Sequence, residues 1–242
     1  MKTPRVPDWL TGWEYAHRGL HSEGVPENSL AAAQAAIAAG MGIECDIQRS
    51  MDGKPIVLHD WDLKRLTGLT GATGSHSADQ LQQLRYIGSD EGPVAFDDLL
   101  QIVAGRVPIL IEIKSKPGYD VAPSCKAVAA ELQSYHGDFA VMSFDPEVAI
   151  WFRAHAPEIL AGLVMREDDI GYTPTEAERL AAFEAAQPDF LAYHIEALPN
   201  DWVADLRAAG LPILSWTVNS SETRLRALAQ VDALISEGAG LP

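Results

Sequence analysis

Short apolar segments typical of β-strands alternate with helix-like segments along most of the chain, and this alternation constrains the fold more than any other feature. The strand-like segments are residues 13–16, 42–47, 55–58, 108–113, 139–143, 159–165, 189–193, 211–217 and 233–236. The helix-like segments are residues 29–39, 96–104, 122–134, 146–155, 175–186, 201–209 and 221–230. Glu27 or Asn28 is placed to cap the first helix and Gly40 to end it. Such alternation favours a parallel sheet covered by helices.

The number of strand-like segments leaves one too many for an eight-stranded barrel. A chain of 242 residues is long enough for one α/β barrel or for two small domains. The surplus strand is one of the two segments on either side of Asp52-Gly53. The turn between them is too short for a parallel crossover and is typical of an antiparallel hairpin. The hairpin would place His59 opposite Cys45 or Asp46, and which of its two arms belongs to the barrel stays open.

The composition argues against several classes of partner. With 18 Lys and Arg against 34 Asp and Glu, the net charge is −16, which repels nucleic-acid backbones and anionic membranes. No apolar run approaches the ~18 residues of a membrane span, and Met1 to Leu10 has no apolar core of a secretory signal. We therefore expect a cytoplasmic protein with no nucleic-acid partner and no stable membrane association. Cys45 and Cys125 are expected to be free thiols, with Cys45 buried.

Carboxylates end two of the strand-like segments. Glu44 and Asp46 are two residues apart, so on a strand both side chains point to the same face and repel each other. A hard divalent cation such as Mg²⁺ or Ca²⁺ would relieve this repulsion, and Glu112 at the end of the next strand is a natural third ligand. The alternative is a solvated strand end with a salt bridge to Lys114.

Two histidines and two cations also lie at strand ends. His17 and His59 could act as base and acid on opposite sides of one phosphorus or carbonyl, although a lone histidine at a strand end is more often structural. Arg18 can hold two phosphate oxygens with its planar fork, and Lys114 supplies a point charge. Trp216 ends a later strand, where it could stack on a substrate's carbon skeleton or belong to the barrel core. The remaining histidines are expected on the surface or in loops, and these are His21, His76, His136, His155 and His194.

These motifs, taken in order, resemble the glycerophosphodiester phosphodiesterase family. The resemblance covers essentially the whole chain, and the joint pattern is specific although each piece is weak. Its amino-terminal part comprises His17-Arg18-Gly19, Pro26-Glu27-Asn28-Ser29, Gly42 to Gln48, Asp52-Gly53, Val57-Leu58-His59-Asp60 and Leu66-Thr67-Gly68. It continues through Phe96 to Leu100, Glu112-Ile113-Lys114, Ser143-Phe144 and Trp216-Thr217-Val218-Asn219.

The resemblance implies a fold and a reaction. The fold would be a TIM-type (β/α)8 barrel forming a single domain over residues 1–242, with a short polar insertion after the second histidine motif. The reaction would be hydrolysis of glycerophosphodiesters to an alcohol and glycerol 3-phosphate. The positions that match Glu44, Asp46 and Glu112 would bind a divalent metal, Mg²⁺ or Ca²⁺, with Mn²⁺ as a further candidate.

The resemblance also implies residue roles. His17 and His59 match the acid–base histidines, and Arg18 and Lys114 match the phosphate-contacting positions. One departure concerns the last strand, which in the family commonly ends Thr-Asp-x-Pro, whereas this chain has Ser236-Glu237-Gly238-Ala239. The role of Glu237 therefore stays open.

Two other functions remain as alternatives. A barrel glycosidase would use two of Glu44, Asp46 and Glu112 as its acid–base pair, but would leave the cations and histidines without a task. A non-catalytic protein that binds phosphate esters would not need both histidines. The polar insertion and the negative net charge favour a small water-soluble diester over an intact bilayer phospholipid.

Overall fold

A computed structural model describes residues 6–168 and 172–242 of the chain, so the Met1 to Leu10 segment, where we expect no signal, lies partly outside the described residues. Within these ranges eight parallel strands close a barrel. In their order around it they are β1 (Tyr15–Ala16), β2 (Gly42–Arg49), β5 (Ile109–Ile113), β6 (Phe139–Ser143), β7 (Ala161–Met165), β8 (Phe190–His194), β9 (Ile213–Val218) and β10 (Ala233–Ser236). The predicted TIM-type barrel is confirmed.

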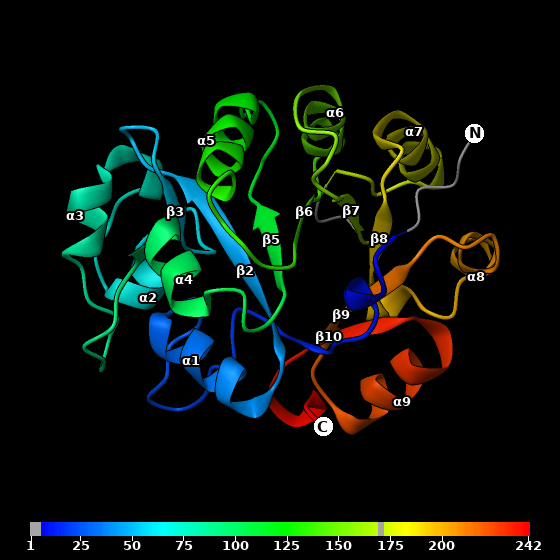
Figure 1. Cartoon of the computed structure of the whole chain (residues 1–242), viewed down its shortest axis with the longest axis horizontal. Coiled ribbons are helices and arrows are strands. Elements are labelled where there is room, and N and C mark those ends of the chain that lie inside the picture. The colour runs from blue at the N-terminus through cyan, green and yellow to red at the C-terminus, as the bar shows by residue number, and fades with distance from the viewer. Residues whose placement is uncertain (1–5, 169–171) are drawn as a thin grey trace.

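Helices surround the barrel and connect its successive strands (Figure 1). They are α1 (Leu30–Ala39), α4 (Phe96–Val103), α5 (Ala122–Leu132), α6 (Pro146–His155), α7 (Glu176–Ala186), α8 (Asp201–Ala208) and α9 (Ser221–Gln230). The prediction of the α1 cap was wrong. The Ser29 hydroxyl caps the helix by accepting a hydrogen bond from the Ala32 amide, and the Asn28 side chain donates to Asp46 instead. Gly40 ends the helix at φ 69°, as predicted. In the described part of the chain no helix is long and apolar enough to cross a bilayer.

The predicted hairpin accounts for the surplus strand. Strand β3 (Pro55–Val57) pairs antiparallel with β2, with Ile47 opposite Val57, and the Leu58 amide donates to the Asp46 carbonyl. His59 therefore follows β3 beside the carboxylate strand. The first arm of the hairpin belongs to the barrel and the second lies outside it.

The segment between the hairpin and α4 forms a small layer of its own. It contains α2 (Lys64–Thr67), α3 (Ala78–Gln82) and β4 (Val94–Ala95), which pairs with β3. These elements lie to one side of the barrel in Figure 1. Their buried side chains, with two from the hairpin, form a separate apolar cluster of Ile56, Leu58, Leu63, Ala78, Leu81 and Tyr86. The sequence predicted this region only as a polar insertion, because its helices are too short to show a periodicity.

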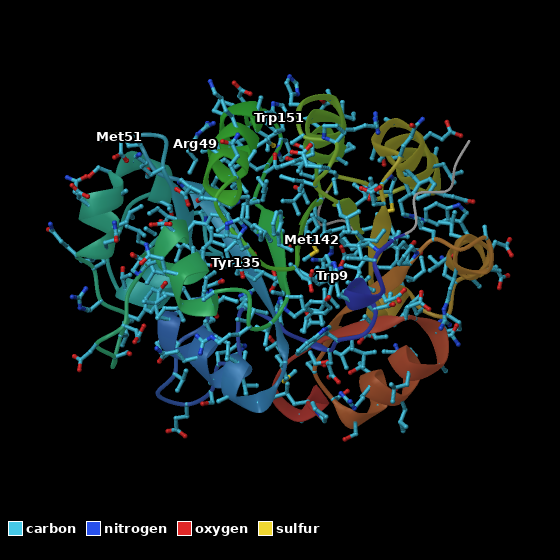
Figure 2. All side chains as sticks on the ribbon, in the orientation of Figure 1. Trp9, Arg49, Met51, Tyr135, Met142 and Trp151 are labelled. Carbon is cyan, nitrogen blue, oxygen red and sulfur yellow. The ribbon has the colours of Figure 1, made fainter. Side chains whose placement is uncertain are left out.

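Alternation along the strands divides the core into two layers. Ile43, Cys45 and Ile47 of β2 pack outward against the helices, so Glu44 and Asp46 face the barrel interior. Both cysteines are buried and free, as predicted for Cys45. An inner cluster fills the barrel below the carboxylates; among its members Met142 and the half-buried Trp9 are labelled near the centre of Figure 2.

Candidate active site

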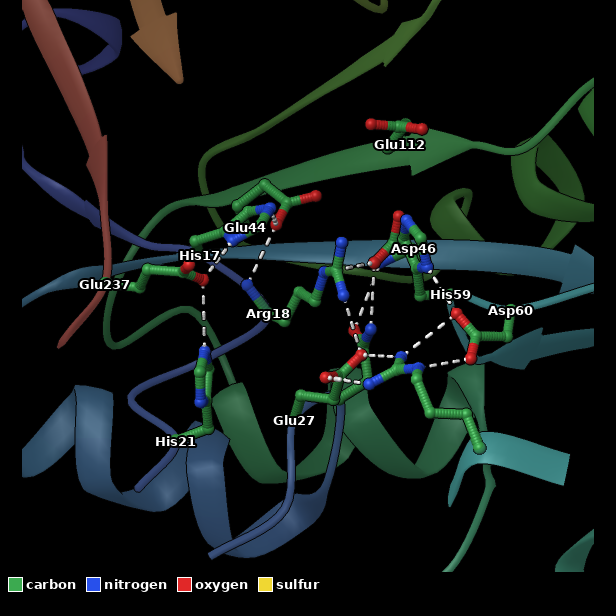
Figure 3. A network of polar contacts seen from close by, with 12 residues as sticks. His17, Arg18, His21, Glu27, Glu44, Asp46, His59, Asp60, Glu112 and Glu237 are labelled. Atoms are coloured by element: carbon green, nitrogen blue, oxygen red, sulfur yellow. Dashed lines mark hydrogen bonds and ion pairs between the residues drawn. The ribbon is translucent and has the colours of Figure 1, made fainter. Parts of the chain in front are cut away.

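Three neighbouring barrel strands, β1, β2 and β5, together with the end of β3 beside β2, bring the predicted polar residues together. They lie at the carboxyl end of the barrel, where barrel enzymes position their reacting groups. Figure 3 shows His17, Arg18, Glu44, Asp46, His59 and Glu112 facing one region. Lys114 joins them through ion pairs to Glu112 and Asp46.

Glu44, Asp46 and Glu112 converge at one point. One carboxylate oxygen from each lies within 4.8 Å of the others, and the three residues expose only 1, 2 and 8% of their surface. Burial, with the charges of Asp46 and Glu112, raises the pKa of Glu44 well above its usual range. The geometry therefore holds three buried oxygen ligands that repel one another.

Asp46 has partners that keep it ionised. Lys114 Nζ lies 3.2 Å from Asp46 Oδ1, and Asn28 Nδ2 donates to Oδ2 at 2.9 Å. Burial opposes ionisation of this carboxyl, but the charges of Lys114, His59 and Arg18 outweigh it and hold its pKa well below its usual range. Lys114 also pairs with Glu112 at 2.7 Å. The alternative salt bridge is thus present, but at a buried strand end rather than a solvated one.

The His17-Arg18-Gly19 turn packs closely against both β2 and α1, and the Gly19 amide donates to the Glu44 carbonyl at 3.1 Å. Arg18 has φ 56° and Gly19 φ 77°, and a Cβ on Gly19 would lie 2.9 Å from the Ala32 Cβ, so glycine is required there. The turn points the Arg18 amide at Glu44 Oε2, at 2.9 Å. Arg18 Nε is buried and makes no hydrogen bond among the described residues, while Asp46 Oδ2 lies 3.5 Å away. This donor therefore has hydrogen-bonding capacity that the described residues do not use.

Carboxylates hold one ring nitrogen of each predicted catalytic histidine. His17 Nδ1 lies 2.6 Å from Glu237 Oε2, and His59 Nδ1 lies 2.7 Å from Asp60 Oδ1. A neutral imidazole that donates from Nδ1 has a free lone pair on Nε2. The His17 Nε2 atom lies 3.9 Å from Glu44 Oε2, so it faces the carboxylate cluster.

Glu237 and His21 join the site although the sequence did not place them there. His21 lies in a loop, as predicted, and its Nε2 atom lies 3.3 Å from the same Glu237 oxygen that contacts His17, so this histidine also belongs to the site. Hydrogen bonds from His17 and then His21 hold the pKa of Glu237 well below its usual range. Asp60 and Asn28 are further contributors. The available signal was the position of Asp60 directly after His59 and of Asn28 in the motif Pro26-Glu27-Asn28-Ser29.

Trp216 lies on β9, away from the carboxylates. Its indole N–H donates to the Ala192 carbonyl at 3.2 Å, and its ring packs edge-on against Phe144 at 5.2 Å. The His194 ring lies 4.8 Å from it. The side chain is half-buried above the inner core cluster. It thus covers the barrel interior and also presents a ring at the surface.

Comparisons with known proteins agree on one family. The model of the "Glycerophosphoryl diester phosphodiesterase family" matches residues 17–240. Glycerophosphodiester phosphodiesterase 1 of Bos taurus is 24% identical, over 86% of this chain and 72% of that protein. A glycerophosphodiester phosphodiesterase of Caldanaerobacter subterraneus is 25% identical, over 92% of each.

Solved structures agree on the fold. A phosphodiesterase of Oleispira antarctica, in complex with the product sn-glycerol-3-phosphate, superposes with a TM-score of 0.81 at 24% identity, over 93% of this chain and 92% of that one. A glycerophosphodiester phosphodiesterase of Thermotoga maritima superposes with a TM-score of 0.74 at 26% identity, over 92% of both chains.

Proposed function

The chain belongs to the glycerophosphoryl diester phosphodiesterase family and is a phosphoric diester hydrolase, and from this premise we propose that it hydrolyses glycerophosphodiesters to an alcohol and glycerol 3-phosphate. The observation that carries this proposal is the meeting of three buried carboxylates with two histidines that are each held at Nδ1. A glycosidase would need neither the histidines nor the cations. A binding protein would not need both histidines.

The carboxylate cluster fits a divalent cation. Its donors are all oxygens, which suit Mg²⁺, Ca²⁺ or Mn²⁺. Lys114 partly balances Asp46 and Glu112, while burial and the charges of these two carboxylates raise the pKa of Glu44, so a cation at this point would offset a charge that the cluster leaves uncompensated. When bound by Glu44, Asp46 and Glu112, the metal would polarise the phosphate and offset its charge.

Arg18 and Lys114 would bind the phosphate. The Arg18 guanidinium has a buried Nε that makes no hydrogen bond to any residue the structure describes, and its Nη1 donates to Glu27 at 2.8 Å. Lys114 is held between Glu112 and Asp46, which raise its pKa against the effect of burial. Both side chains therefore stay charged and can stabilise the negative charge of the transition state.

His17 and His59 would transfer the protons. One Nε2 removes the proton of the nucleophile as its oxygen bonds to phosphorus, and the other protonates the alkoxide as the P–O bond breaks. Glu237 and Asp60 would hold the two rings in the required tautomers. The nucleophile is water, or the glycerol 2-hydroxyl, which would first give a cyclic phosphate. Phosphorus NMR during turnover separates these routes, because only the second produces a transient cyclic ester.

We propose a small soluble substrate. The insertion beside His59 is largely polar, and its large exposed apolar side chains in the described residues are Leu69 and Ile87. Two separate aliphatic side chains are an ordinary surface feature rather than a site for an acyl chain. Trp216 would contact the carbon skeleton of the substrate. Comparing kcat/KM for glycerophosphocholine and a lysophospholipid tests this, and a tenfold preference for the lysolipid would exclude it.

One assay tests the proposed function. The purified protein is incubated with glycerophosphocholine, with and without a chelator, and released glycerol 3-phosphate is measured. We expect chelation to abolish release and Mg²⁺, Ca²⁺ or Mn²⁺ to restore it. Full activity after exhaustive dialysis against chelator would remove the metal from the mechanism, and no release under any condition would refute the function.

A further inference from the structure

The polar insertion contributes one charged side chain, Arg65, that contacts Glu27 and Asp60, two carboxylates labelled in Figure 3. Arg65 on α2 forms a pair of hydrogen bonds with Glu27, at 2.9 Å from Nη1 and 2.7 Å from Nη2. The same guanidinium also donates to Asp60 through Nη2, at 3.0 Å, and through Nε. Arg65 thus joins two carboxylates that come from different loops.

Each of these carboxylates holds a residue of the proposed active site. Asp60 contacts His59 Nδ1 at 2.7 Å, and Glu27 contacts Arg18 Nη1 at 2.8 Å. Arg65 is therefore one side chain away from both the second histidine and the phosphate-binding arginine. A surface cavity of about 350 Å³ is lined by His59, Lys114 and Arg65, among others.

The insertion fixes where Arg65 lies. Leu58, directly before His59, and Leu63, two residues before Arg65, are both buried in the separate apolar cluster. The Thr73 hydroxyl also donates to the Asp60 carbonyl at 2.9 Å. The cluster therefore sets the position of α2 relative to the His59 motif.

Two considerations indicate a role in the reaction rather than in stability. The Arg65 side chain is 49% exposed, and exposed ion pairs usually add only about 0–1 kcal/mol. A small displacement of a reacting group, by contrast, can cost a large factor in rate. Within residues 6–168 and 172–242, the ion pairs of Arg65 are those with the carboxylates of Glu27 and Asp60.

We propose that Arg65 is a positioning residue of the phosphodiesterase: by bridging Asp60 and Glu27 it holds His59 and Arg18 in register, and this is the contribution of the insertion to the site. The inference rests on the proposed function. Lysine cannot reproduce the two paired contacts, because its single ammonium lacks the planar fork of arginine.

The first test compares Arg65→Met and Arg65→Lys with Arg85→Met. Arg85 lies in the same insertion, and its hydrogen bonds to described residues go to the Gln82 and Leu84 carbonyls. We expect kcat to fall roughly tenfold or more in Arg65→Met, with little recovery in Arg65→Lys and a change below twofold in Arg85→Met. An unchanged Arg65→Met, or full recovery by lysine, would overturn the proposal.

The second test combines Arg65→Met with His59→Ala. If Arg65 acts partly through His59, its effect on kcat should be clearly smaller in the His59→Ala background than in wild type, and the remainder is its effect through Glu27 and Arg18, since residues that act as a unit are not additive. A loss that multiplies fully with that of His59→Ala would instead indicate general destabilisation of the insertion and would contradict the proposal.

A readout independent of turnover keeps this inference separate from the function. In ¹⁵N-histidine NMR spectra of the wild-type protein, His59 is assigned by its absence in His59→Ala. We expect Arg65→Met, but not Arg85→Met, to shift the His59 ring nitrogens. An active wild type with unmoved His59 signals would refute only the positioning role. An inactive wild type would refute the proposed function, and the NMR comparison would still decide on Arg65.

Discussion

At the residue scale, the two proposed catalytic histidines are equivalent in one respect, since a carboxylate binds each at Nδ1. We expect His17→Ala and His59→Ala each to lower kcat by on the order of 10²–10⁴, as for lost acid–base catalysis. The double variant should be far less active than wild type but much better than the product of the single losses, because the histidines act together. Steady-state kinetics measures these losses of kcat, and circular dichroism checks that each variant is folded. Activity within threefold of wild type in His59→Ala would contradict the assigned role.

Glu237 allows a finer test of the same arrangement. Glu237→Gln keeps the size of the side chain but removes the charge that faces His17 Nδ1 at 2.6 Å. A hydrogen bond to a charged group contributes about 1.5–3 kcal/mol, so kcat should fall roughly 10- to 100-fold. His21→Ala is the matched control, because its contact with Glu237 is longer, at 3.3 Å, and we expect an effect below threefold. Equal losses in both variants would show that Glu237 does not act through His17.

At the element scale, the strand positions of the site could be predicted and the contacts between loops could not. The two-residue period placed Glu44 and Asp46 on one face, and Asp52-Gly53 predicted the hairpin that brings His59 beside them. Glu237 contacts a histidine 220 positions away, which no local pattern contains. The α1 cap shows a second limit: Asn28 and Ser29 are both good caps, and the tertiary bond from Asn28 to Asp46 decides between them.

The packing of α5 near α4 predicts a pH dependence of stability. Burial, followed by the charge of Asp97, raises the pKa of Glu131 to about 7. Below the unfolded-state pKa of about 4.5 the group is protonated in both states. As the pH rises toward 7 the unfolded state ionises first, so this carboxyl lowers the stability of the fold, and the penalty persists above pH 7.

Glu131→Gln removes this penalty. We expect the variant and wild type to have similar melting temperatures near pH 4.5, and the variant to melt higher at pH 8. Glu184→Gln on α7, at an exposed position, is the control and should change little at either pH. Thermal denaturation at the two pH values measures the difference, and a lower melting temperature of Glu131→Gln at pH 8 would show that the charge is compensated in the fold.

At the scale of the whole molecule, the barrel concentrates negative charge where stability alone would avoid it. The chain carries a net charge of −16, and three of its carboxylates are buried within 4.8 Å of one another. The rest of the barrel interior is apolar and is filled by the inner cluster that includes Leu110 and Met142. The fold therefore tolerates a local repulsion at the end of the barrel where we propose that the reaction occurs.

A divalent metal should convert this repulsion into stability. A ligand that binds only the folded state at 100 times its dissociation constant adds about 2.7 kcal/mol. For a chain of this size each kcal/mol raises the melting temperature by roughly 2–4 °C, so saturating Mg²⁺, Ca²⁺ or Mn²⁺ should add about 5–10 °C. Glu44→Gln should melt higher than wild type in chelator, because the least compensated charge is gone, and should lose most of the metal-dependent increase together with activity. Differential scanning calorimetry with and without chelator tests both effects. A Glu44→Gln protein that gains as much from the metal as wild type would exclude Glu44 as a ligand.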